Sequence, residues 1–250
     1  MVAAKAAGAG GRAAPYNAKA GLQLMMAAFR GDLAAAERAL RDAADPDHVQ
    51  PGDDYTPLLA AASKGHLEVA RALCQGGADK DRTDEAGRTP MLLASSHGHL
   101  DVVRLLCEAG ADKERAKPDG RMPLFAASAK GNVEVVQALC DLGVELDRCI
   151  EDGATSLLAA ATNGHVAVVR ALCAAGASKD RAKRGGVTPL HAAAAQGHEE
   201  IIRALCEAGA DAELATADGR TPLLLAAAHG HEEAVRALGR APADLGGASG

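Results

Sequence analysis

The sequence predicts an all-α solenoid, in which helix–turn–helix units stack in a row and loops, or fingers, project from one edge. Two observations predict this fold class. The first is a Thr-Pro-Leu-like segment that recurs every 33 residues without a gap, because a fixed period of about 20–50 residues is typical of a solenoid. The second is that 48% of the residues are hydrophobic but only 2% are aromatic, so Ala, Leu and Val dominate and suit closely spaced helices. The six segments begin at Thr56, Thr89, Met122, Thr155, Thr188 and Thr221.

Each repeat carries signals for where its two helices start and stop. Thr is a good N-cap, because its hydroxyl can accept a backbone N–H that has no partner inside the helix, and the Pro behind it fits the first helical position. A short Ala-rich helix follows, and Gly65 and its equivalents can take the left-handed conformation that ends it. The second helix, such as 100–108, is apolar except for one stripe of Asp101, Arg104 and Glu108, so neighbouring repeats must cover it. The turn-forming residues after it predict a finger.

The stack is expected to have an atypical repeat at its start and a weak end. The first unit keeps a Gly at position 31 but lacks Thr-Pro, as a capping repeat does, and its second helix is expected at 33–41. The last helix is expected to fade after Leu238, which leaves the C-terminal face weakly capped. An organelle transit peptide is the alternative for the acid-free N-terminus, but that segment has no Ser. The expected parts are a disordered tail (1–20), the capping repeat (21–50), six repeats of 33 residues (51–240) and a second disordered tail (241–250).

This pattern resembles the ankyrin repeat over residues 21–240. The 33-residue unit opens with Thr-Pro-Leu, contains Gly-His nine residues later and ends near Gly-Ala-Asp. Only the third full repeat replaces the His, with Asn132. The resemblance implies that each of these histidines ties its loop to the preceding one. It also implies that a protein partner binds the concave surface, which the finger tips and the exposed side of the first helices line.

Composition argues against several other classes of protein. The net charge is −6 with a pI near 5.8, whereas sequence-independent nucleic-acid binding needs a basic surface. No apolar run approaches the roughly 18 residues that a membrane span needs. We therefore expect no nucleic acid and no membrane among the partners, and we expect a monomer.

The cysteines and histidines recur in register, so they do not form clusters. Stacked helices lie roughly 8–10 Å apart, which is too far for a disulfide, and the sequence has no Cys-x-x-Cys pair for zinc. Small, buried, free thiols are expected at five of the Cys positions, and they indicate a reducing compartment, the cytoplasm or the nucleus. No catalytic triad or phosphate-binding loop is visible. We therefore expect no enzyme activity, no cofactor and no metal. The five positions are Cys74, Cys107, Cys140, Cys173 and Cys206.

Polar residues that differ between repeats are the expected partner-binding positions. Stacking constrains every repeat alike, whereas a partner contacts each repeat differently. On the fingers the expected residues are Tyr55, Glu85, Arg88, Arg121, Glu151, Arg184 and Arg220. At the ends of the first helices they are Lys64, His97, Lys130, Asn163, Gln196 and His229.

The third full repeat departs most from the others and suggests a central apolar patch. Its Thr is replaced by Met122, so the hydroxyl cap is lost, at a cost of about 1 kcal/mol. Interface hot spots tend to lie near the middle of a binding surface. The expected anchor patch is Tyr55, Phe125, Leu142, Cys149 and Ile150. Two alternatives are that Phe125 is buried between repeats and that sequence drift produced one irregular unit.

These observations predict a non-catalytic protein–protein interaction module, acting as an adaptor or a regulatory subunit. One alternative is a substrate-recruiting subunit of a multi-subunit enzyme, such as a ubiquitin ligase or a kinase complex. A weaker alternative is a structural spacer without a specific partner. The partner itself cannot be predicted, because a scaffold does not determine its ligand.

Overall fold

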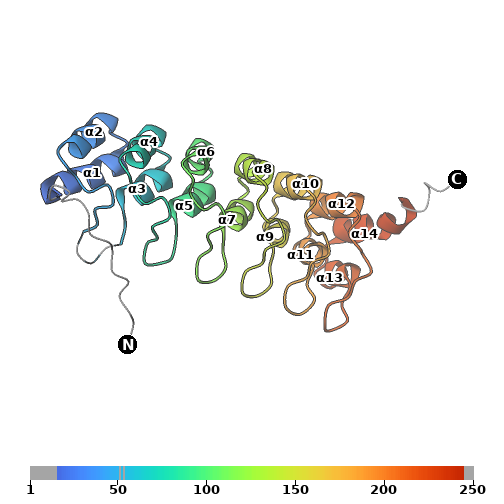
Figure 1. Cartoon of the computed structure of the whole chain (residues 1–250). Helices are drawn as coiled ribbons and strands as arrows, with labels where there is room; N and C mark the ends of the chain where they lie inside the picture. The colour runs from blue at the N-terminus through green and yellow to red at the C-terminus, as the bar shows by residue number, and fades with distance from the viewer. Residues whose placement is uncertain (1–15, 51, 53, 245–250) are drawn as a thin grey trace.

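A computed structural model describes residues 16–50, 52 and 54–244, and in this part of the chain fourteen α-helices form seven stacked pairs with no named strand. Figure 1 shows the pairs following one another in a single row, with α1 and α14 at opposite ends. The first helices of the pairs are α1 (Ala18–Arg30), α3 (Pro57–Lys64), α5 (Pro90–His97), α7 (Pro123–Lys130), α9 (Ser156–Thr162), α11 (Pro189–Gln196) and α13 (Pro222–Ala228). The second helices are α2 (Leu33–Arg41), α4 (Leu67–Gln75), α6 (Leu100–Glu108), α8 (Val133–Asp141), α10 (Val166–Ala174), α12 (Glu199–Glu207) and α14 (Glu232–Asp244).

The helices form two layers, and the fingers project on the side of the first-helix layer (Figure 1). Each first helix packs on the next first helix, and each second helix packs on the next second helix. The core lies between the layers and between successive repeats. Every first helix from α3 to α11 places one large side chain there that is at most 1% exposed: Leu58, Met91, Leu124, Leu157 and Leu190.

The predicted caps are present. The Thr56 hydroxyl oxygen accepts a hydrogen bond from the backbone N–H of Leu59 at 3.3 Å, and Thr89, Thr155, Thr188 and Thr221 cap their helices in the same way. α7 has Met122 at this position and no side-chain cap. The loss of the hydroxyl cap in the third full repeat is therefore confirmed.

The helical array extends beyond the expected boundaries at both ends. α1 begins at Ala18, inside the expected tail, because the Asn17 side chain accepts the N–H groups of Lys19 and Ala20 and starts the helix. The rest of the expected N-terminal tail, 1–15, lies outside the described residues, as do 245–250 at the other end.

The expectation that the last helix fades after Leu238 is wrong, because α14 continues to Asp244. The earlier second helices end at a left-handed Gly such as Gly209, which has φ +86°. The equivalent position in the sequence is a proline, Pro242, and the backbone φ of a proline, about −65°, excludes this left-handed turn. The weak cap is present: Leu223 and Leu224 are 41% and 54% exposed, whereas their counterparts in the earlier full repeats are buried.

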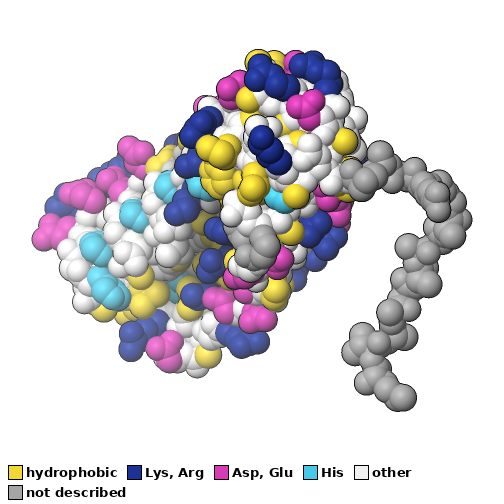
Figure 2. All heavy atoms as spheres, turned by 90° about the vertical axis from the view of Figure 1, so that its left-hand side faces the viewer, with side chains coloured by type: hydrophobic (Ala, Val, Ile, Leu, Met, Phe, Trp, Pro, Cys, Tyr) yellow, Lys and Arg dark blue, Asp and Glu magenta, His cyan; other side chains and the backbone are white. Residues whose placement is uncertain are grey.

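At the other end of the stack, Figure 2 shows hydrophobic atoms on the surface, and Met26 and Phe29 are exposed.

The recurring cysteines are half-buried and not fully buried as expected. They lie at the edges of the second helices and pack against the core there. Burial raises the pKa of each of these five thiols, which disfavours the reactive thiolate. No helix among the described residues is both long and apolar enough to cross a membrane.

Candidate protein-binding groove

The fingers are closed turns. In the finger of the third full repeat, the backbone N–H of Ile150 donates to the carbonyl oxygen of Ala154 at 3.0 Å, and Gly153 donates back to Ile150 at 2.9 Å. The fingers that start at Asp84, Lys117, Lys183 and Thr216 have the same pair of bonds. The side chains on these turns are therefore held by a defined backbone.

From the finger that starts at Asp84 onward, neighbouring fingers are joined at their tips, except at one point. Glu151 N–H donates to the Asp119 carbonyl at 3.3 Å, Arg184 N–H to Asp152 at 2.9 Å and Ala217 N–H to Gly185 at 2.9 Å. The equivalent donor facing the Ala86 carbonyl would belong to Pro118, which has no N–H. The ladder of finger tips is thus interrupted between the fingers that start at Asp84 and Lys117.

The opposite edge of the array is held by a second ladder. His66 Nε2 lies 3.2 Å from the carbonyl oxygen of Phe29, and His99, His165, His198 and His231 repeat this contact at 3.1–3.3 Å. Figure 2 shows histidine side chains following one another along one side of the molecule. In the third full repeat, Asn132 makes two hydrogen bonds in place of the one histidine contact. Its Nδ2 donates to the carbonyl oxygens of Ser95 and Ser96 at 2.8 and 3.0 Å. The role that the resemblance implied for these histidines is confirmed.

A shallow groove of about 580 Å³ lies between the fingers and the first helices of three central repeats. Leu92, Phe125 and Leu158, one from each of α5, α7 and α9, line its apolar part together with Ile150 from a finger. All except Ile150 are less than 10% exposed, so they form a floor and do not protrude. The polar and charged lining residues are Arg88, Ser96, Lys117, Arg121, Lys130, Asp152, Thr162 and Asn163.

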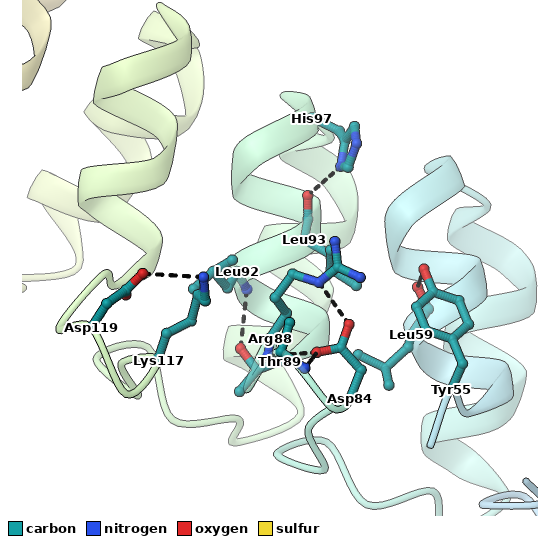
Figure 3. A network of polar contacts seen from close by, with 11 residues as sticks. Tyr55, Leu59, Asp84, Arg88, Thr89, Leu92, Leu93, His97, Lys117 and Asp119 are labelled. Carbon is teal, nitrogen blue, oxygen red and sulfur yellow. Dashed lines mark hydrogen bonds and ion pairs between the residues drawn. The ribbon is translucent and has the colours of Figure 1, made fainter. Parts of the chain in front are cut away.

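The charged side chains on the finger side of the groove are held by ion pairs. Arg88 Nε donates to the buried Asp84 carboxylate at 2.6 Å, and Asp84 also accepts the Arg88 backbone N–H at 2.8 Å. Figure 3 shows this pair between Tyr55 on one side and the neighbouring Lys117–Asp119 pair on the other. The geometry therefore fixes where the cationic groups lie.

Asp119 connects the two cations of the next finger. Its carboxylate accepts a hydrogen bond from Lys117 Nζ at 3.2 Å and lies 3.6 Å from Arg121 Nε. Burial by itself raises the pKa of Asp119, but the backbone N–H of Arg121 and the Lys117 ammonium outweigh that effect and lower it. Asp119 is therefore a carboxylate at neutral pH and holds both cations at the groove.

The groove brings together six of the residues expected to bind a partner. Four of them are polar and two are apolar. The six are Arg88, Arg121, Phe125, Lys130, Ile150 and Asn163.

Several expected residues, Asn163 of the groove among them, have a structural contact within their own repeat. His97 and His229 each lie 2.8 Å from a carbonyl oxygen four residues earlier, at the end of their first helices. Asn163 donates to Ala159 in the same manner at 2.8 Å, and Arg220 pairs with Asp218 at 2.9 Å. The remaining exposed positions on the fingers and first helices lie outside the groove: Lys64, Glu85, Glu151, Arg184 and Gln196.

The structure does not bring the five residues of the expected anchor patch together in one place. Leu142 follows α8 in the second-helix layer and lines a separate hollow with Arg104 and Cys107. Tyr55 stacks on Phe29 at a ring-centroid distance of 5.8 Å. Of the five, only Phe125 and Ile150 line the groove, while Cys149 is a half-buried finger residue that does not line it.

The groove also contains residues that the sequence did not single out, among them Lys117, Leu92 and Leu158. Lys117 occupies the position in its repeat that Ile150 occupies in the next, 33 residues later, so the register could have identified it. Leu92 and Leu158 are buried packing residues of α5 and α9, and each also lines the groove.

No group of three or more His, Cys, Asp or Glu side chains is placed to hold a metal ion within the described ranges. The acidic side chains of the loop edge have another role: Asp81 accepts the N–H of Asp112 at 2.9 Å and Asp180 accepts that of Asp211 at 3.0 Å. Each contact joins one repeat to the next.

Comparison with known proteins agrees with this architecture. A family model for ankyrin repeats (3 copies) matches residues 24–117, 113–183 and 175–246. The crystal structure of the human ASB11 ankyrin repeat domain is similar, with 30% identity and a TM-score of 0.78, covering 86% of this chain and 96% of that one. The ankyrin repeat domain of Bcl-3, described as a unique member of the IkappaB protein family, is 27% identical with a TM-score of 0.74, covering 86% and 97%. No curated protein matches the chain. Because the family model spans most of the sequence and the stacked pairs, caps and loop ties follow its repeat, the chain belongs to the ankyrin repeat family.

Proposed function

We propose that this protein is a non-catalytic adaptor or regulatory subunit that binds a protein partner in the groove over α5, α7 and α9. Ankyrin repeat domains are in general protein–protein interaction modules. The observation that carries the proposal for this chain is the groove itself, with an apolar floor and charged side chains on its rim. This arrangement of an apolar centre and a polar rim is typical of a protein interface.

The proposal includes a monomer in a reducing compartment, the cytoplasm or the nucleus. The six cysteines are free, and free thiols suit such a compartment. Nucleic acid is not among the proposed partners, because the net charge of the chain is −6.

Affinity capture from native extract, followed by mass spectrometry, tests the groove. The groove variant is Arg121→Glu with Lys130→Glu, since both side chains are exposed and line the groove. The matched control is Arg170→Glu with Arg203→Glu, which changes the net charge equally but lies on the second helices α10 and α12. Circular dichroism should show that both variants remain folded.

A protein captured by the wild type and the control but lost by the groove variant is the expected result. If that protein belongs to an enzyme complex, the substrate-recruiting role replaces the adaptor role. Equal capture by all three proteins would reject the groove. Failure of any of them to capture a specific protein would favour the structural spacer.

A further inference from the structure

The groove is locally basic although the protein is acidic overall. Its lining contains four cationic side chains, Arg88, Lys117, Arg121 and Lys130, and a single carboxylate, Asp152, on a chain of net charge −6. The Asp152 carboxylate lies 4.0 Å from Lys183 Nζ, so its charge is already partly balanced from the next finger. Asp84 and Asp119 do not line the groove, but they balance part of the charge of Arg88, Lys117 and Arg121. A partner segment therefore meets a smaller excess of positive charge, to which Lys130 contributes most.

Two of these cations retain groups that can bind a carboxylate. Arg88 contacts Asp84 through Nε alone, which leaves its terminal amino groups available, and its side chain is 44% exposed. Lys130 ends α7, is exposed and has no ion pair within the described part of the chain. Arg88 belongs to the finger side of the groove and Lys130 to the helix-end side. An acidic segment that crosses the groove can thus be held on both sides.

The interruption in the finger ladder lies next to this groove: Ala86 and Pro118 do not line it, but Arg88 and Lys117 on the same two fingers do. At the other finger pairs from Asp119 onward, a tip carbonyl is occupied by the N–H of the next finger. Because Pro118 has no N–H, the exposed Ala86 gains no such bond, and its finger is not tied to the next.

The apolar floor favours one inserted side chain. Phe125 is 8% exposed and Ile150 is half-buried, and both line the groove. Burial of an apolar side chain stabilises a complex by about 25 cal/mol per Å² removed from water. The cationic rim around this floor then determines which flanking residues are accepted.

We propose that the groove recognises an extended acidic segment of the partner protein, with one apolar side chain placed against Phe125 and Ile150 and flanking carboxylates on Arg88, Arg121 and Lys130. This inference rests on the proposed function and adds the chemistry of the partner segment. Electrostatic complementarity of this kind selects between partners more than it raises affinity.

The test is a display selection with a library of random 12-residue peptides on the wild-type protein. We expect the enriched peptides to contain at least twice the library fraction of Asp and Glu, with a large apolar residue at a constant position among them. A selected peptide should bind on the order of tenfold more weakly to the Arg121→Glu, Lys130→Glu variant, because attraction becomes repulsion. The Arg170→Glu, Arg203→Glu control should bind it as the wild type does, and added salt should weaken binding to the wild type.

The results separate this inference from the proposed function. Enriched peptides that are neutral or basic, or that bind the groove variant as well as the wild type, would overturn the acidic segment. A second result would also overturn the acidic segment: the selection enriches no peptide, and native extract yields a groove-dependent partner whose binding segment lacks acidic residues. In each case a groove-dependent partner would leave the proposed function intact. If no captured protein depends on the groove, the proposed function itself fails.

Discussion

The Nε2 atom of His191 lies 3.0 Å from the backbone carbonyl oxygen of Arg220 in the next repeat. A carbonyl oxygen only accepts, so Nε2 donates and carries a hydrogen. The other ring nitrogen, Nδ1, then accepts the backbone N–H of Thr188 at 3.3 Å and lies 2.8 Å from the Thr188 hydroxyl. The side chain is fully buried, and its contacts use both nitrogens of a neutral imidazole. Burial lowers the pKa of His191, against the raising effect of its backbone hydrogen bonds.

His191 is expected to make the stability of the array depend on pH. Between the usual histidine pKa of about 6.5 and the lower pKa in the folded state, the unfolded chain binds more protons. The free energy of unfolding should therefore fall as the pH decreases below about 6.5, by about 1.4 kcal/mol for each unit by which the pKa is lowered. His191→Leu introduces the leucine that the equivalent positions 92 and 158 have in their repeats. This variant should lose the part of the pH dependence of stability that His191 causes.

Urea unfolding of both proteins from pH 7.5 to 5 checks this prediction. The other histidines contribute equally to both curves, so the difference between wild type and variant isolates His191. A difference that stays constant with pH, or that favours the wild type more at low pH, would contradict the neutral buried imidazole.

Asn132 is expected to stabilise the centre of the stack as the histidines do elsewhere. Its Nδ2 donates to the carbonyl oxygens of Ser95 and Ser96, and Asn132→Ala leaves both without this donor. The expected loss is about 1–3 kcal/mol in the free energy of unfolding. Asn132→His restores the residue of the other repeats and should recover most of it. Urea unfolding of the three proteins measures this, and equal losses for the two variants would show that the amide is specifically required.

The sequence was sufficient to predict the repeat and its helices because each helix carries local signals. The second helices at 33–41 and 100–108 have the predicted bounds, since an Asp or His opens them and apolar periodicity continues through them. Asp101, Arg104 and Glu108 form the exposed stripe that was predicted. The start of the array was less predictable, because there the capping side chain of Asn17 decides where the helix begins.

The groove could be predicted only in part, because it depends on which layer a residue belongs to. Leu142 and Ile150 are eight positions apart in the sequence and both are apolar, but the first follows a second helix and the second lies on a finger. The burial of Phe125 could have been predicted from the repeat, because Leu92 and Leu158 occupy the same repeat position and leucine is a typical core residue. The pairing of Arg88 with Asp84 and the effect of Pro118 on the ladder needed the three-dimensional arrangement.

A buried Thr hydroxyl cap is expected to contribute to the stability of the array. The Thr155 side chain is fully buried, and its hydroxyl accepts the N–H of Leu158 at 3.2 Å. Thr155→Val keeps the shape but removes the acceptor, so we expect a loss of about 1–2 kcal/mol. The matched control is Met122→Leu, at the uncapped helix, which should change the stability by less than about 1.5 kcal/mol. Thermal or urea unfolding measures both, and a neutral Thr155→Val would show that the cap contributes nothing here.

Pro118→Ala is expected to close the interruption in the finger ladder. The variant supplies the missing N–H opposite the Ala86 carbonyl, where the other fingers have Glu151, Arg184 and Ala217 as donors. Its net effect on global stability should be small, because the gain of about 0.5–1.5 kcal/mol from one hydrogen bond opposes the about 0.4–1 kcal/mol by which proline restricts the unfolded chain. Amide hydrogen exchange followed by NMR is therefore the measurement. The new amide at position 118 should be protected to a degree similar to that of the Glu151 amide, with the Arg88 amide as an internal reference because it is bonded to Asp84 in both proteins. Exchange at the rate of an open amide would mean that the spacing of the two fingers, and not the absent N–H, interrupts the ladder.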